Sequence, residues 1–258
     1  MKPLTAYLSA KKAAGEGLFI PYIMAGANGL EKLQEELHLL AQNGATAIEI
    51  GVPFSDPVAD GPAIQLAGIA AREHGVTLKK IIATLQTIAI QIPCILMGYA
   101  NSFFHYGLTE LVQDLAETPV TGIIIPDLPY EHRQLILPAL ADSHIALISL
   151  ISLTSPAERI RTIVQTAEGF VYAVTVNGTT GSDQAYRESL DEHLRTLTAE
   201  SPIPVVAGFG IATPEQVQRF QTCCDGVVVG SKIVTTLAEK GLTATGQLVA
   251  ELSAACKK

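Results

Sequence analysis

The feature that most constrains the fold of this chain is the regular alternation of short runs rich in Ile and Val with longer segments of helical periodicity. Short apolar runs of this kind are typical of parallel strands that are covered on both faces, and the segments between them supply the covering helices. The pattern therefore predicts eight parallel strands. They lie at 18–24, 46–51, 94–98, 121–125, 145–150, 170–176, 204–208 and 225–229.

The segments between the strands carry apolar residues at helical spacing. One runs from Leu30 to Ala41 and stops before Gly44. Eight strands with covering helices close most simply into an α/β fold of the (β/α)8 TIM-barrel type, here with an extra N-terminal helix. The alternative is a doubly wound open sheet, but residues 25–29 match its Gly-rich first turn poorly. Further helices fit 4–13, 63–73, 78–90, 108–117, 130–142, 156–166, 188–199, 214–222 and 244–255.

The composition fits one compact domain that spans residues 1–258. Of the 258 residues 48% are hydrophobic and only 16% are charged, and no low-complexity tract or linker divides them. The net charge of -8 argues against nucleic acid or an anionic membrane as the main partner, because both require basic patches. No apolar run is long enough for a transmembrane helix and the first residues lack signal-peptide features, so we expect a cytoplasmic protein.

The cysteines and histidines indicate neither a disulfide framework nor a metal site. The six histidines are scattered without metal-ligand spacing. The cysteines follow strand and helix patterns, so we expect them to be small buried residues. They are Cys94, Cys223, Cys224 and Cys256.

Glu49 is a lone carboxylate inside the apolar strand pattern 46–51. Because successive strand residues face opposite sides, Ile48 and Ile50 should face the helices while Glu49 faces the barrel interior. Burial near the end of the strand should raise the pKa of its carboxyl group, which suits a group that gives and takes a proton. The alternative is a structural carboxylate paired with an interior Arg or Lys, and no strand pattern supplies that partner.

A second carboxylate, Asp60, follows eleven residues later at the end of a loop with three prolines. The prolines restrict the loop, which could then hold the carboxylate at a fixed place beside the same strand end. The alternative is a plain Asp-Gly turn. Asp56, in the middle of this loop, more simply accepts hydrogen bonds from the loop itself.

Glycine loops follow the last two predicted strands, at Gly208 and Gly210 and again at Gly230. Thr213 begins a capping box, and Ser231 begins a further helix. Bare backbone N–H groups at such helix starts form the phosphate site that TIM barrels often carry. Tight turns are the alternative use of these glycines.

A third glycine loop, 177–183, follows the sixth strand and contains Thr180 and Gly181. It could close over a substrate, although a surface loop has the same composition. No strand pattern contains a lysine, and Lys232 is better placed to begin a helix than to form a Schiff base. A substrate whose own ring accepts electrons would need only an acid–base pair.

Several of these segments resemble the tryptophan synthase α subunit family, and the resemblance covers essentially the whole chain. The long Pro-Phe-Ser-Asp-Pro segment is the most specific of them, whereas the phosphate glycines fit several barrel families. The segments are 19–26 (FIPYIMAG), 48–62 (IEIGVPFSDPVADGP), 124–129 (IIPDLP), 208–210 (GFG) and 225–231 (DGVVVGS).

The resemblance implies a carbon–carbon lyase that cleaves indole-3-glycerol phosphate to indole and glyceraldehyde 3-phosphate. In that interpretation Glu49 protonates indole C3 and handles the glycerol hydroxyl proton, and Asp60 accepts the indole N–H. The residues implied for the ring pocket are Tyr22, Ile125, Tyr172 and Phe209, with Thr180 from the loop. Those implied for the phosphate are Gly181, Gly210, Gly230 and Ser231.

The resemblance also implies a partner, because the family works with a β subunit, normally as α2β2. Pyridoxal phosphate belongs to that β subunit, so no cofactor is expected in this chain. The likeness places the docking surface on the loop that contains Asp56 and Asp60 and on the aromatic stretch 99–104. A stand-alone indole-releasing lyase and a non-catalytic phosphate-binding subunit are the alternatives.

The chain departs from the usual family pattern at three places: Ala27, Thr179 and the stretch 98–102. None of them involves Glu49 or Asp60. The departures concern closure of the loop and contact with the β subunit.

Overall fold

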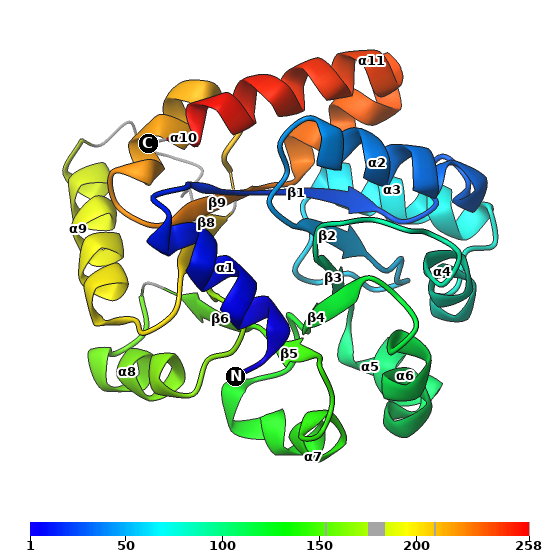
Figure 1. Ribbon diagram of the computed structural model, residues 1–258, viewed down its shortest axis with the longest axis horizontal. Coiled ribbons are helices and arrows are strands. Elements are labelled where there is room, and N and C mark those ends of the chain that lie inside the picture. Colours follow the sequence, from blue (N-terminus) through cyan, green and yellow to red (C-terminus); the bar gives the residue numbers. More distant parts are fainter. Residues whose placement is uncertain (153, 175–183, 209, 258) are drawn as a thin grey trace.

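In the part of the chain that the structure describes, nine strands form one parallel sheet that is rolled into a barrel (Figure 1). The structure is a computed structural model and describes residues 1–152, 154–174, 184–208 and 210–257. The strand order is β5-β4-β3-β2-β1-β9-β8-β7-β6. The strands are β1 Leu18–Met24, β2 Ile48–Gly51, β3 Cys94–Met97, β4 Val120–Ile124, β5 Ala146–Leu147, β6 Ser149–Ser152, β7 Val171–Val174, β8 Val205–Gly208 and β9 Gly226–Val229.

The barrel closes within the fifth predicted strand, which the structure divides at Ile148. The first half, β5, pairs with β4 through Gly122 and Ala146. The second half, β6, pairs with β7 through Ser149 and Val171. The prediction of one continuous strand over 145–150 was therefore wrong in detail, because this segment must bend to pair with β4 on one side and β7 on the other. The eight expected strand positions and the TIM-barrel class are confirmed.

The two faces of the sheet carry two separate apolar sets. Ile48 and Ile50 belong to the larger set, which packs against the helices. The other set fills the barrel interior, and it places alternate residues of each strand on the inside. Glu49 lies between the two isoleucines and therefore faces inward, as predicted. The interior set is Leu4, Leu8, Leu18, Ile20, Ala47, Ile95, Ile124, Ala146, Ile148, Phe170, Tyr172, Val206 and Val228.

The helices surround the barrel and follow the predicted periodicity with three differences. The predicted helix 78–90 ends at residue 85, and Pro138 interrupts the predicted helix 130–142, which becomes a 3-10 helix and one short α-helix. Residues 100–106 form a helix that the pattern did not predict. The elements are α1 Pro3–Ala13, η1 Leu30–Lys32, α2 Leu33–Gln42, α3 Pro62–Glu73, α4 Leu78–Leu85, α5 Ala100–Tyr106, α6 Leu108–Leu115, η2 Tyr130–Leu135, α7 Leu137–Leu140, α8 Ala157–Gln165, α9 Gln184–Glu200, α10 Pro214–Gln221 and α11 Ser231–Ala255.

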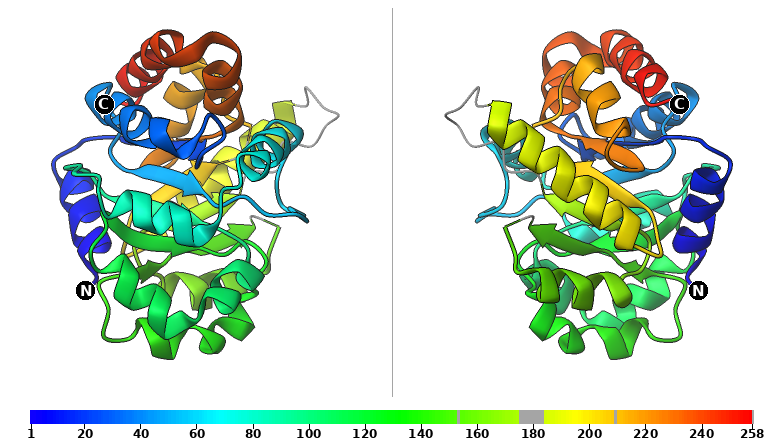
Figure 2. Two further views of the ribbon diagram at one scale, coloured as in Figure 1. Left: turned by 90° about the vertical axis from the view of Figure 1, so that its right-hand side faces the viewer. Right: turned by 90° about the vertical axis from the view of Figure 1, so that its left-hand side faces the viewer.

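Helix α1 covers the N-terminal end of the barrel. Its Leu4 and Leu8 are fully buried in the interior set. The hydroxyl of Thr5 accepts a hydrogen bond from the N–H of Gly169 at 2.7 Å, and Lys2 Nζ donates to the carbonyl of Leu140 at 2.7 Å. Figure 2 shows α1 at one end of the barrel and the loop between β2 and α3 at the other. The strand C-termini are therefore the end at which a ligand can enter.

Candidate active site

Glu49 is held by backbone pairing on both sides of β2. It lies in register with Tyr22 of β1 and Ile95 of β3, and the residue is only 1% exposed. Its Oε2 atom has no hydrogen-bond partner among the described residues. The alternative of a structural ion pair with an interior Arg or Lys thus finds no partner in this part of the chain. A buried carboxylate oxygen without a partner is costly to fold, which points to a functional role.

Glu49 and Asp60 line one cavity of about 190 Å³ at the C-terminal end of the barrel. Its apolar wall includes Ile64, Met97 and Val228, and its polar wall is formed by the start of α11. The proline-containing loop thus brings Asp60 back to the end of β2, as the spacing suggested. The described lining residues are Tyr22, Glu49, Ala59, Asp60, Gly61, Ile64, Met97, Tyr172, Gly210, Ile211, Ala212, Val228, Gly230, Ser231 and Lys232.

Two strand glycines make room for the tyrosines of this cavity. A Cβ atom on Gly51 would lie 1.9 Å from the hydroxyl of Tyr22, and one on Gly208 would lie 2.4 Å from the hydroxyl of Tyr172. Each strand end therefore needs glycine so that a ring can lie across it. Burial raises the pKa of both tyrosine hydroxyls well above the ordinary value for tyrosine, so both keep their protons.

Tyr99 holds the Asp60 loop at both of its ends. Its hydroxyl accepts a hydrogen bond from the N–H of Ala59 at 2.9 Å and donates one to the Asp60 carboxylate. Its ring stacks on Phe54 with a centroid distance of 5.0 Å. Tyr99 is 3% exposed, so this contact is part of the buried structure. It fixes the position of a carboxylate that would otherwise depend on a surface loop.

The environments of the two carboxyl groups separate their pKa values. Burial, with a smaller contribution from the charge of Asp60, raises the pKa of Glu49 to about 8. Burial raises the pKa of Asp60 to about 6, and the hydrogen bond from Tyr99 opposes that rise. At pH 7 Glu49 is therefore mainly protonated and Asp60 mainly ionised. One group can donate a proton while the other stabilises positive charge.

The opposite wall of the cavity is the N-terminus of α11. The N–H groups of Ile233 and Val234 donate to the carbonyl of Gly230 at 2.8 and 3.0 Å. The N–H groups that precede them have no acceptor within the helix and carry the positive end of its dipole. Gly210, with φ of 76°, brings a second stretch of backbone to the same wall. This arrangement suits a phosphate group.

Comparisons with known proteins support the family resemblance that the sequence motifs indicate. The sequence profile of the family "Tryptophan synthase alpha chain" matches residues 8–258. The tryptophan synthase α chain of Streptococcus sanguinis is 53% identical over 241 residues, which are 93% of each chain. The chain belongs to the tryptophan synthase α chain family.

Relatives and solved structures of the family agree over the full length. The α chain of Listeria welshimeri is 52% identical over 238 residues, or 92% of this chain and 91% of that one. The crystal structure of the α subunit from Legionella pneumophila has a TM-score of 0.90 at 30% identity and covers 99% of this chain and 98% of that chain. A structure of Mycobacterium tuberculosis tryptophan synthase has a TM-score of 0.90 at 32% identity, with coverage of 100% and 99%.

Most of the predicted site residues of this family member meet at the cavity, and one lies beside it. Tyr22, Tyr172, Gly210, Gly230 and Ser231 line the cavity together with the two carboxylates. Ile125 instead lines a neighbouring pocket of about 420 Å³, which shares Ala59 with the cavity. Thr180, Gly181 and Phe209, as well as the loop 177–183 and its Thr179, lie outside the described residues.

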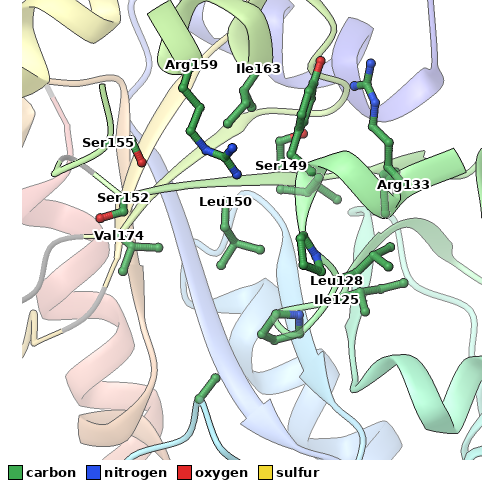
Figure 3. A pocket seen from close by; sticks show the side chains of 16 residues that line it. Ile125, Leu128, Arg133, Ser149, Leu150, Ser152, Ser155, Arg159, Ile163 and Val174 are labelled. Atoms are coloured by element: carbon green, nitrogen blue, oxygen red, sulfur yellow. The ribbon is translucent and has the colours of Figure 1, made fainter. Parts of the chain in front are cut away.

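Figure 3 shows the neighbouring pocket, which is lined by residues that follow β4 and by residues of β6. Leu150 lies between Ser152 and Ser155 on one side and Ile125 and Leu128 on the other. The neighbouring pocket is thus lined partly by apolar side chains and meets the cavity at Ala59.

The sequence reasoning missed two polar residues of the site. Tyr99 was assigned only to a docking surface, although a tyrosine directly after a barrel strand is a signal of a site residue. Lys232 was assigned only to a helix start, yet it lines the cavity. A docking surface on the stretch 99–104 requires exposed aromatic residues, and this expectation was largely wrong. Tyr99 is buried and holds the Asp60 loop, and Phe103 is buried in the core. Phe104 alone among these aromatic residues is exposed, at 39%.

None of the helices in the described residues is long and apolar enough to cross a membrane. No group of three or more His, Cys, Asp or Glu side chains in the same residues could hold a metal ion. The four cysteines are buried, as predicted.

Proposed function

We propose that Glu49 and Asp60 are the acid–base pair with which this member of the tryptophan synthase α chain family cleaves indole-3-glycerol phosphate to indole and glyceraldehyde 3-phosphate. The supporting observation is the unpartnered, 1% exposed carboxyl group of Glu49 in the same cavity as Asp60.

In the first step protonated Glu49 donates its proton to C3 of the indole ring. A pKa of about 8 keeps this proton in place at neutral pH and leaves the group acidic enough to release it. Protonation of C3 places positive charge on the ring nitrogen. Ionised Asp60, whose position Tyr99 fixes, accepts the N–H of the ring and stabilises this charge.

In the second step the Glu49 carboxylate accepts the proton of the glycerol hydroxyl next to the ring. The oxygen forms the aldehyde carbonyl, the bond between C3 and the side-chain carbon breaks, and its electron pair returns to the ring and neutralises the nitrogen. The proton given to C3 replaces the broken bond, and Glu49 regains a proton from the hydroxyl. The substrate supplies its own electron sink, and atoms and charge balance.

The walls of the cavity support this assignment. Tyr22 and Tyr172 would contact the ring or hold Glu49, and Ile125, in the pocket that meets the cavity at Ala59, would be a further ring contact. Gly210 in the loop after β8, together with Gly230 and Ser231 at the start of α11, would bind the phosphate through backbone N–H groups. The roles of Thr180, Gly181 and Phe209 stay predictions.

Membership in the family implies a β subunit as partner, and we propose an α2β2 assembly in which pyridoxal phosphate belongs to β. Val58 is 85% exposed on the Asp60 loop, Phe104 is 39% exposed on α5 and Leu135 is 61% exposed on η2. These apolar residues lie in the segments that follow three consecutive strands, β2, β3 and β4. Exposed apolar residues in neighbouring segments favour a protein interface there. The cytoplasmic location stays a prediction.

The experiment is indole release from indole-3-glycerol phosphate, with and without a β subunit, by the wild type and Glu49→Gln. The wild type should release indole faster when β is present. Loss of general acid–base catalysis should lower turnover of the variant by about 10²-fold to 10⁴-fold. Near-normal turnover by Glu49→Gln would overturn the proposed roles, and high activity without β would indicate a stand-alone lyase.

A further inference from the structure

The active-site cavity already contains an ionised carboxylate before a substrate binds. At pH 7 that carboxylate is Asp60, since Glu49 is mainly protonated, and the whole chain has a net charge of -8. A substrate phosphate would add up to two further negative charges. Lys232 is the one basic side chain among the described residues that line the cavity.

Lys232 lies where a lysine is unfavourable for the protein alone. It is the second residue of α11, whose first turn contains no acidic residue. A positive charge at this end opposes the helix dipole and destabilises the helix start. Within the described ranges no carboxylate forms an ion pair with it. An anionic ligand in the cavity would offset that cost.

A second observation indicates that this helix start faces a ligand site. The Oε2 atom of Glu49, which lines the same cavity, is buried and has no partner among the described residues. Lys232 is exposed, so its long side chain has room to reach an anion at the cavity mouth.

We propose that the ammonium group of Lys232 pairs with the phosphate of the substrate and sets the preference of the enzyme for phosphorylated over unphosphorylated indole glycerol. The proposal rests on the function proposed above. The backbone N–H groups of Gly230 and Ser231 fix the position of the phosphate, and Lys232 supplies the full charge that they lack. Lys232 takes no part in the proton transfers at Glu49.

The test compares Lys232→Met and Lys232→Arg with the wild type on indole-3-glycerol phosphate and on indole-3-glycerol. Lys232→Met should raise KM for the phosphorylated substrate by about 5-fold to 30-fold, the range of a charge-assisted contact, and leave kcat within about 2-fold. It should leave kcat/KM for indole-3-glycerol unchanged. Lys232→Arg should keep most of the phosphate preference, because it keeps the charge.

Lys240→Met is the matched control, since it removes the same charge from an exposed position further along α11. Its KM should equal that of the wild type. An unchanged KM in Lys232→Met, or an equal loss for both substrates, would overturn the proposal. If Lys240→Met raised KM as much as Lys232→Met, the effect would come from the net charge of the chain, and the proposal would be overturned as well.

Binding of glycerol 3-phosphate by titration calorimetry separates this proposal from the proposed function. If the wild type binds it and Lys232→Met binds about 5-fold to 30-fold more weakly, the role of Lys232 stands even if no indole is released. If both bind equally, the role of Lys232 is wrong although cleavage is observed.

Discussion

Replacing Glu49 by glutamine should make the protein more stable at alkaline pH while it abolishes most of the activity. Glutamine has nearly the shape of glutamate and stays neutral at every pH. The change therefore removes the ionisation of a side chain that is 1% exposed and leaves the packing with Tyr22 and Ile95 in place.

The sign follows from the raised pKa. The folded protein holds the Glu49 proton with a pKa of about 8, whereas the ordinary value of 4.5 applies to the unfolded chain. Below pH 4.5 the Glu49 carboxyl group is protonated in both the folded and the unfolded state, so it does not lower the free energy of unfolding. As the pH rises from 4.5 to about 8, the unfolded state gains by ionising and the folded state loses stability; above a pKa of about 8 both states ionise and the loss levels off.

The magnitude follows from the same two pKa values. One pH unit corresponds to about 1.4 kcal/mol, so the loss is about 1 kcal/mol at pH 5 and about 5 kcal/mol at pH 9. Glu49→Gln avoids this loss. Its stability relative to the wild type should therefore increase by about 4 kcal/mol between pH 5 and pH 9.

The assay is urea unfolding of wild type and variant at several pH values from 5 to 9, with the midpoint and the slope fitted at each pH. Glu73→Gln is the control, because it removes one carboxylate from an exposed position of α3. Parallel stability curves for wild type and Glu49→Gln would refute the reasoning, since they would mean that Glu49 titrates alike in the folded and unfolded chain.

Two further predictions concern residues that support the active-site cavity. Tyr99→Phe keeps the ring stack but removes the hydrogen bonds to Ala59 and Asp60. The kcat/KM of the variant should fall by about 10-fold to 100-fold. The acid limb of its kcat/KM profile should move to higher pH, because the pKa of Asp60 rises without the hydrogen bond from Tyr99. An unchanged profile would show that Tyr99 does not position Asp60. Gly51→Ala places a Cβ atom 1.9 Å from the Tyr22 hydroxyl, so thermal unfolding should show a loss of about 1–3 kcal/mol together with lower turnover. Gly68→Ala, whose Cβ atom meets Met24 at an ordinary 3.6 Å, should lose no stability; equal losses in both variants would contradict the close contact.

Much of the fold follows from local pattern, because each strand and helix carries its own periodicity. The orientation of Glu49 is an example. Ile48 and Ile50 on either side of it pack against the helices, so the side chain of Glu49 faces the barrel interior. The bend at Ile148 was not predictable in this way. It depends on hydrogen bonds to β4 and β7, whose positions are set by the closing of the whole barrel.

The sequence by itself determined that this chain forms a TIM barrel, that Glu49 faces inward, and that glycine loops end the last two strands. Only the tertiary structure decided that Tyr99 holds Asp60, that Gly51 leaves room for Tyr22, and that Lys232 lines the same cavity. The physical reason is distance along the chain. Periodicity is a property of neighbouring residues, whereas each of these contacts joins different strands or the loops after them, which meet only when the strands pair in the barrel.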